Sequence, residues 1–180
     1  TPGNAEAFLE YLSEDWLLQS ATMLISIDRP AWGNSTLLES GNEVLTLAQQ
    51  SQVIGAYFES LKSQYPSSRI IVAGHSLGGS LLARLMADHP QQIDAGLILA
   101  GTVDSALAEP RWYHRMAKTG LVQWMIGEEL SRSNLEMLSL PEDVSSAESN
   151  YTSIKQPLTI IQGRKDKLVS YKNAAYAKAV

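Results

Sequence analysis

Short apolar runs and helical apolar spacing alternate along most of this chain. The runs are rich in Val, Ile and Leu, as is typical of strands buried in a parallel sheet, and they lie at residues 23–27, 70–73, 96–101 and 158–162. Apolar residues at helical spacing predict helices over residues 4–18, 42–65 and 77–89 and a last one that begins near residue 170. This alternation predicts an α/β protein whose mostly parallel sheet carries helices on both faces.

Two details refine these elements. Asn42 can cap the long second helix, and Pro66 ends it, because proline cannot continue a helix. Residues 102–153 break the alternation: they are helical in character but irregular, and no strand is evident. Their stripe of Trp and Met side chains fits either packing onto the core, which we favour, or contact with an apolar substrate.

The most informative stretch is residues 69–83, RIIVAGHSLGGSLLA. An apolar strand leads into the pattern Gly-x-Ser-x-Gly at residues 74–78, and a helix with apolar spacing follows. A strand that turns sharply into a helix holds the central serine, Ser76, in a strained conformation with its hydroxyl projecting above the strand end. Any side chain at position 74 or 78 is expected to clash in such a turn, so glycine suits both positions.

The strand before the pattern and the helix after it favour a nucleophilic serine over an ordinary strand-to-helix turn. The N–H of Leu77 comes at the helix N-terminus, where it is unpaired and can donate to a developing oxyanion. A phosphate-binding loop is a poorer interpretation, because no lysine follows the glycines.

Composition narrows the possibilities further. A chain of 180 residues suffices for one core, and 44% hydrophobic with 18% charged residues is typical of a soluble globular protein. The net charge of −5 and the lack of a basic cluster argue against nucleic acid as a partner. The absence of cysteine excludes disulfides and thiolate nucleophiles, and it leaves the redox state of the cellular compartment open. No stretch is long enough to span a membrane.

These features together resemble the α/β-hydrolase superfamily, and the resemblance covers essentially the whole chain. Residues 25–35 look like the family's strand and following loop, with Ala31 where glycine is common. Residues 158–166, LTIIQGRKD, look like the strand whose end bears the catalytic acid. Thr1-Pro2-Gly3-Asn4 looks like the tail of the oxyanion loop, which implies the backbone N–H of Thr1 as a second oxyanion donor.

The resemblance also implies a division of the chain. Residues 1–101 and 154–180 correspond to the two parts of the core domain, and residues 102–153 correspond to a small helical cap that roofs the active site. The last helix ends at Val180, before the strand and histidine that follow the acid in this family. We therefore expect the chain to be truncated at both ends.

Asp166 is the candidate acid that orients a catalytic base. It follows an apolar strand and Gly163, at the edge of the sheet where parallel strands deliver ligand-binding side chains. The alternative is a solvated aspartate in a polar turn. Asp28 competes for the same role from another strand end, although holding its own loop is the more ordinary role for it.

The catalytic base is harder to assign, because none of the three histidines is well placed. His75 is expected to pack beneath the elbow, since neighbouring side chains there point apart. His89 ends the helix after the elbow, where a histidine is favourable on dipole grounds alone. His114 falls in the expected cap. The resemblance implies a histidine beyond residue 180.

The leading hypothesis is a serine hydrolase that cleaves a carboxylic ester through an acyl-enzyme at Ser76. It needs no cofactor and no metal, and its partner is a small, partly apolar ester-like molecule. Thioesterase, amidase, perhydrolase and C–C bond hydrolase activities stay open, because the pocket decides among them. The other hypotheses are a non-catalytic binding protein of the same fold and a lipid-active hydrolase. The oligomeric state stays open.

Overall fold

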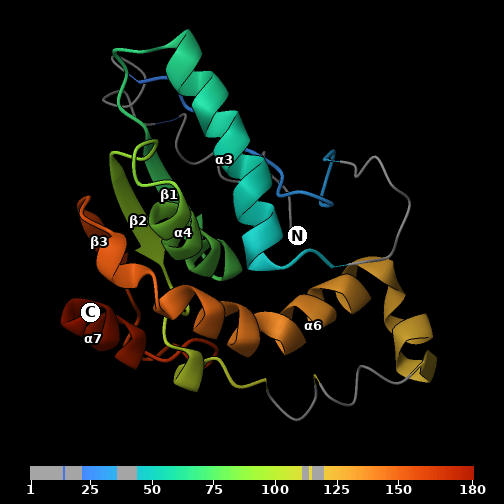
Figure 1. The fold of residues 1–180 in the computed structure, drawn as a ribbon. Helices are drawn as coiled ribbons and strands as arrows, with labels where there is room; N and C mark the ends of the chain where they lie inside the picture. Colours follow the sequence, from blue (N-terminus) through green and yellow to red (C-terminus); the bar gives the residue numbers. More distant parts are fainter. Residues whose placement is uncertain (1–13, 15–21, 36–43, 111–113, 115–119) are drawn as a thin grey trace. The chain divides into compact units, whose positions relative to one another are not determined.

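The computed structural model describes residues 14, 22–35, 44–110, 114 and 120–180. The chain forms two compact units, Thr1–Val44 and Leu45–Val180, and each is described by itself. The second unit contains the strands and helices that bear on function (Figure 1). Within the described ranges, no helix combines the length and the apolar character that crossing a bilayer requires.

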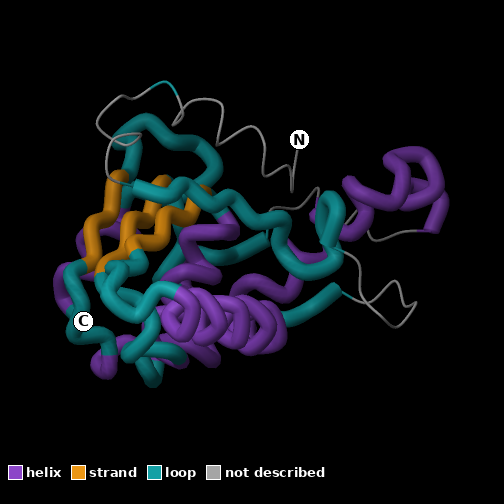
Figure 2. Tube along the Cα trace, turned by 90° about the horizontal axis from the view of Figure 1, so that it is seen from above, coloured by secondary structure: helices purple, strands orange, loops and turns teal. Residues whose placement is uncertain are grey.

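The second unit is built on a parallel sheet of three strands in the order β1-β2-β3, which lie side by side in Figure 2. The strands are β1 (Ile71–His75), β2 (Ala95–Leu99) and β3 (Leu158–Ile161). They correspond to three of the four predicted apolar runs. The register pairs His75 with Leu99 and Leu99 with Ile161, so the carboxyl ends of all three strands lie at one level.

Among the described residues of this unit, four helices and two short 3-10 turns accompany the strands. They are α3 (Leu47–Gln64), α4 (Leu77–Asp88), α6 (Gly120–Glu148), α7 (Lys172–Ala179), η1 (Ser105–Leu107) and η2 (Tyr151–Ser153). The alternation of strands and helices confirms the predicted α/β class.

The start of α3 corrects a prediction. The helix begins at Leu47, and its N-cap is Thr46 rather than Asn42, which lies outside the described residues. The Thr46 hydroxyl accepts a hydrogen bond from the Gln49 N–H at 3.2 Å, and the Gln49 side chain accepts one from the Thr46 N–H at 2.9 Å. This reciprocal capping box satisfies donors that a helix start otherwise leaves unpaired.

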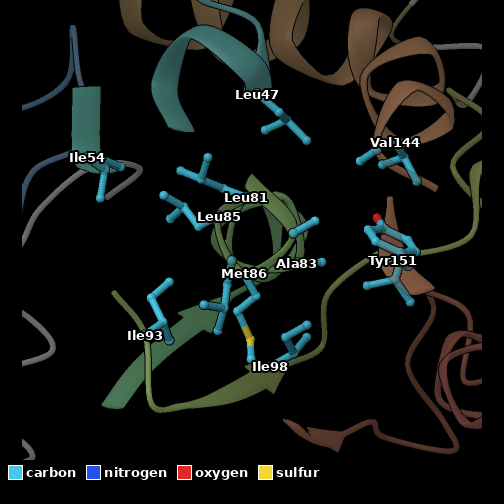
Figure 3. Packing of buried hydrophobic residues seen from close by; sticks show 14 of the residues in the cluster. Leu47, Ile54, Leu81, Ala83, Leu85, Met86, Ile93, Ile98, Val144 and Tyr151 are labelled. Atoms are coloured by element: carbon cyan, nitrogen blue, oxygen red, sulfur yellow. The ribbon is translucent and has the colours of Figure 1, made fainter. Parts of the chain in front are cut away.

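The core lies between α4 and its neighbours, as the helical spacing predicted. Figure 3 looks along α4: its apolar side chains radiate toward α3, the strands and α6. Leu82 is 1% exposed and Met86 is fully buried, with Met86 directed at Ile98 of β2. Burying such a side chain contributes about 1.5–3 kcal/mol. The α4 helix, which follows the elbow directly, is therefore anchored by fully buried side chains.

The described helices cover one face of the sheet, and helices on the other face stay a prediction, because the helix predicted over residues 4–18 lies almost wholly outside the described residues. Gly74 of β1 and Ile98 of β2 face α4 and are buried, as strand alternation requires. Residues of opposite parity are exposed in β1 and β3, with Ile71 at 69% and Ile161 at 56%, and half-buried in β2. Among the described residues of this unit, the helices thus cover one face of the sheet.

Residues 102–153 are largely helical, as predicted, and α6 supplies most of them. Its backbone is interrupted at Gly127, where φ is 78° and ψ is 168°, and Pro141 lies inside the helix. The side chain of Asp143 accepts a hydrogen bond from the Leu47 N–H at 3.2 Å, which ties α6 to the start of α3. The assignment of residues 102–153 as a separate cap stays a prediction, and part of the expected Trp and Met stripe lies outside the described residues.

The described part of the first unit is a loop. Residues 22–29 contain no strand, although one was predicted at residues 23–27, because this apolar run pairs with no other described segment. The helix predicted over residues 4–18 falls almost wholly outside the described residues. Ala31 has a φ of 69°, which explains why glycine suits this position of the loop.

Candidate active site at the carboxyl edge of the sheet

The residues that follow the three strands lie next to one another. The Ser76 N–H donates to the Leu99 carbonyl at 2.9 Å, and the Ala100 N–H donates to the Ile161 carbonyl at 2.9 Å. These bonds extend the ladders one step past the strand ends. Ser76, Ala100 and Gln162 therefore stand side by side at the carboxyl edge, where open α/β sheets bind their ligands.

Ser76 has the backbone of a nucleophile elbow. Its φ of 54° and ψ of −121° lie in a region that side chains strongly disfavour, and the residue is exposed. The next helix begins at once: the Ser76 carbonyl accepts a hydrogen bond from the Gly79 N–H at 2.9 Å. The Ser76 side chain makes no capping hydrogen bond to α4. The strained turn thus presents the hydroxyl at the strand end.

The glycines of the motif have different roles from those predicted. A Cβ at Gly74 would press against the Gly78 carbonyl, as expected. A Cβ at Gly78 meets no described atom within 4 Å, so the predicted clash there is wrong. The second tight position is Gly79, whose Cβ would lie 2.8 Å from the Ile98 side chain and 2.9 Å from the Gly101 Cα. Gly79 and Gly101 thus let α4 approach β2 closely beside the elbow.

Leu77 is the first residue of α4. Its N–H has no intrahelical acceptor, since the residue four positions earlier belongs to β1. Among the described residues it donates to no backbone carbonyl, and it lies at the positive end of the α4 dipole. This N–H is suited to bind a negatively charged oxygen next to Ser76. The predicted second donor, Thr1, lies outside the described residues.

Asp166 lies in the turn after β3, half-buried. Its Oδ1 accepts hydrogen bonds from the Leu168 N–H at 2.8 Å and the Val169 N–H at 3.0 Å. Its Oδ2 accepts one from Nε2 of Gln162 at 3.2 Å. Gln162 was not singled out from the sequence, although a polar residue directly after a buried strand is a usable signal. Asp166 is thus held by its own turn on the same edge of the sheet as Ser76.

His75 lies directly before Ser76 in the elbow, whereas His89 lies at the far end of α4. His75 is exposed, so the prediction that it packs beneath the elbow is wrong. Its position in β1 has the parity of Ile71, on the face that the described helices leave open. His89 ends α4 and its Nε2 lies 3.1 Å from the Ser51 carbonyl. An α-helix rises 1.5 Å per residue, so α4 separates His89 from Ser76 by roughly 18 Å.

His114 is held by α6. Its Nδ1 lies 2.9 Å from Oδ1 of Asn134, and its carbonyl accepts a hydrogen bond from Nδ2 of Asn134 at 3.0 Å. Asn134 itself is only 7% exposed. This paired contact fixes the histidine to the helix, which is a structural use of the residue.

Asp28 belongs to the first unit and is engaged in its own loop. Its Oδ2 accepts a hydrogen bond from the Asn34 N–H at 3.0 Å, and its carbonyl accepts one from the Ser35 hydroxyl at 2.8 Å. A Cβ at Gly33, where φ is 55°, would collide with the Asp28 carboxylate. The geometry agrees with the loop-holding role expected for Asp28.

A cavity of about 140 Å³ lies on the helix-covered side of the sheet. It is lined by α4, β3 and α7, and by residues including Ala83, Tyr151, Ile160 and Tyr176. Burial raises the pKa of the Tyr151 hydroxyl. None of Ser76, Leu77 and Asp166 lines this cavity, so it is separate from the serine site. Within the described ranges, no cluster of three or more His, Cys, Asp or Glu side chains could hold a metal ion.

Comparisons with solved structures place this architecture in a known class. A monoacylglycerol lipase from Paleococcus ferrophilus matches with a TM-score of 0.67 and 16% identity, over 98% of this chain and 76% of the lipase. A lipase-esterase related protein from Clostridium acetobutylicum matches with a TM-score of 0.66 and 14% identity, over 99% and 77%. The N-acyl homoserine lactonase AidH matches with a TM-score of 0.63 and 15% identity, over 98% and 73%. The protein therefore has the α/β-hydrolase fold.

The family follows from the sequence itself. Residues 32–146 match the model of the serine aminopeptidase, S33 family (Hydrolase_4), which is more than half of the chain and includes the elbow. The chain belongs to this family, as the resemblance to α/β-hydrolases predicted. No curated protein matches the chain.

Proposed function

We propose that this protein is a serine hydrolase that transfers an acyl group from a carboxylic ester to water through Ser76. The observation that carries the proposal is the exposed, strained Ser76 at the carboxyl edge of the sheet, level with Gln162 and followed by a helix N-terminus. Membership of a serine hydrolase family supports it. The half-buried Asp166 in the turn after β3 supplies the acid that a serine–histidine pair requires.

In this mechanism the Ser76 Oγ attacks the carbonyl carbon while a histidine base takes the hydroxyl proton. The carbonyl π electrons move onto oxygen, and the oxyanion accepts a hydrogen bond from the Leu77 N–H. The intermediate then expels the alcohol, which takes the proton from the imidazolium, and leaves an acyl-enzyme. Water, deprotonated by the same base, attacks the acyl carbon; the intermediate expels the Ser76 oxygen, which takes the proton back from the imidazolium, and the carboxylic acid is released. Asp166 orients the imidazole throughout.

Two further groups complete the proposal, a base and a second oxyanion donor. The base is the histidine that the family resemblance implies after the final helix, because His89 is remote from Ser76 and His114 is bound to Asn134. The backbone N–H of Thr1 is proposed as the second oxyanion donor. Alanine at His75 or at His114 is therefore expected to leave the reactivity of Ser76 in place.

The class of scissile bond follows from the family and from the fold neighbours. The family description names a serine aminopeptidase, whereas the solved neighbours are described as a lipase, a lipase-esterase related protein and a lactonase. All of these names fit attack on an acyl carbon. Esters are the more reactive substrates, so we place ester cleavage first and amide cleavage second, with a small and partly apolar molecule as the substrate in either case.

The test is reaction of the full chain with a fluorophosphonate, followed by intact mass. One adduct is expected on the wild type and none on Ser76→Ala. Asp166→Asn is expected to react far more slowly, because loss of the orienting carboxylate costs about 10⁴-fold in a serine–histidine–aspartate triad. Turnover of 4-nitrophenyl esters against aminoacyl 4-nitroanilides then decides the bond class. Absence of any adduct on the folded wild type would instead favour a non-catalytic binding protein.

A further inference from the structure

Gln162 links the end of β3 to the turn that carries Asp166. Its Nε2 donates to Oδ2 of Asp166 at 3.2 Å and to the Val169 carbonyl at 3.1 Å. It is the first residue past Ile161, level with Ala100 and Ser76 on the sheet edge. A single carboxamide thus connects the strand, the carboxylate and the far side of the turn.

The orientation of this carboxamide follows from its partners. Both neighbouring groups are acceptors, a carboxylate oxygen and a carbonyl oxygen, so the NH₂ end must face them. The opposite end, Oε1, is buried and finds no hydrogen-bond partner among the described residues. A buried unpaired carbonyl costs free energy, and such exceptions in folded proteins call for an explanation. The favourable free energy that offsets this cost must come from the two hydrogen bonds that Nε2 donates.

We propose that Gln162 is a positioning residue for catalysis, which fixes the Asp166 carboxylate so that it can orient the base. The backbone N–H groups of Leu168 and Val169 hold Oδ1. Gln162 holds Oδ2, so the plane of the carboxylate is defined by donors on both oxygens. This inference rests on the proposed function, because it gives Asp166 the role of the orienting acid.

The choice of a neutral amide has a chemical reason. A donor of the same length with a positive charge would compete with an imidazolium for the carboxylate. A carboxylate at this position would repel Asp166, whereas the protonated acid could donate as the amide does. The other charged side chains of the turn, Arg164, Lys165 and Lys167, are exposed.

Three variants test the role. Gln162→Leu removes both hydrogen bonds at similar volume. Gln162→Glu keeps the shape and donates only when protonated. Gln92→Leu is the matched control, because Oε1 of Gln92 is likewise buried without a partner among the described residues, but Gln92 precedes β2 at the opposite edge of the sheet. Each variant is compared with the full-length wild type for kcat and KM on an ester, fluorophosphonate labelling rate and thermal unfolding.

Gln162→Leu is expected to lower kcat and the labelling rate by about tenfold to a hundredfold, the cost of a misplaced catalytic group, with KM changed by less than about twofold. For Gln162→Glu, the ratio of its rate to the wild-type rate is expected to rise as pH falls from about 8 toward about 5, where a carboxyl beside a carboxylate gains its proton. Gln92→Leu is expected to keep the wild-type kcat.

The outcomes separate this inference from the proposed function. A wild type that is labelled at Ser76, together with a Gln162→Leu variant of unchanged kcat, overturns the inference alone. A rate ratio for Gln162→Glu that stays constant with pH, or an equal loss of kcat in Gln92→Leu, also overturns it, because either result indicates a merely structural role. A folded wild type that is not labelled overturns the proposed function and this inference together.

Discussion

Replacing the strained Ser76 by glycine is expected to stabilise the protein while removing its nucleophile. The φ of 54° and ψ of −121° place this residue where any side chain is disfavoured. Glycine lacks the Cβ that causes the clash, so Ser76→Gly removes the strain from the folded state. The serine hydroxyl makes no capping hydrogen bond to α4 and is exposed, so little stabilisation is lost with it.

The size of the effect is the difference of two opposing contributions. Holding a non-glycine residue in such a region costs about 1–3 kcal/mol. Glycine in turn raises the conformational entropy of the unfolded chain, which costs roughly 0.5–1 kcal/mol. The net gain for Ser76→Gly is therefore about 1 kcal/mol, which for a protein of this size raises Tm by about 2–4 °C.

The comparison that isolates the backbone is Ser76→Gly against Ser76→Ala, since both lack the hydroxyl and only alanine keeps the Cβ. Urea unfolding is expected to give glycine the higher midpoint at equal slope. The matched pair at Ser60, exposed within α3, is expected to give the opposite order, because glycine costs about 1 kcal/mol relative to alanine inside a helix. A Ser76→Gly variant no more stable than Ser76→Ala would refute the assignment of strain to the elbow.

Two further predictions concern packing and pH. Gly79→Ala is expected to lower the free energy of unfolding by about 1–3 kcal/mol through overpacking, whereas Gly78→Ala, with open space at its Cβ, is expected to leave it unchanged or slightly higher, as denaturant midpoints will show. Burial raises the pKa of Asp143 above its ordinary 3.8, so the folded state binds this proton at higher pH than the unfolded chain. Its contribution to stability is therefore present below that ordinary value and is lost as pH rises through the raised pKa. Asp143→Asn cannot titrate, and its unfolding midpoints in that window are expected to lack this decline; equal slopes for variant and wild type would contradict the assignment.

Local patterns in the sequence were sufficient to predict the elbow. The apolar run before Ser76 and the helical spacing after it lie within fifteen residues and depend on no distant partner. The same holds for α4, where the apolar spacing predicted a helix, and for β3, where an apolar run predicted a strand. These features follow from periodicity and turn chemistry, which a sequence displays directly.

Features that depend on contacts between residues far apart in the chain could not be predicted from local sequence patterns. The tight position proved to be Gly79 rather than Gly78 because Gly101, from another strand end, packs against it. The run at residues 23–27 has strand character, but a strand also needs a ladder partner. The start of α3, in contrast, has a local signature: Thr46 and Gln49 form the Thr-x-x-Gln pattern of a capping box, which the sequence itself displays.

Two different physical means place the proposed serine and acid on one edge. Ser76 is held in a strained backbone conformation by the close approach of α4 to β2 and by its hydrogen bond to Leu99. Asp166 is placed by side-chain hydrogen bonds within a turn, and Gln162 connects that turn to β3. Changes at the two sites should therefore differ in kind: relief of backbone strain at Ser76 raises stability, whereas loss of the amide at Gln162 lowers kcat. Since β2 alone lies between the two strands, its register with both is what brings Ser76 level with Gln162, the residue that holds the proposed acid.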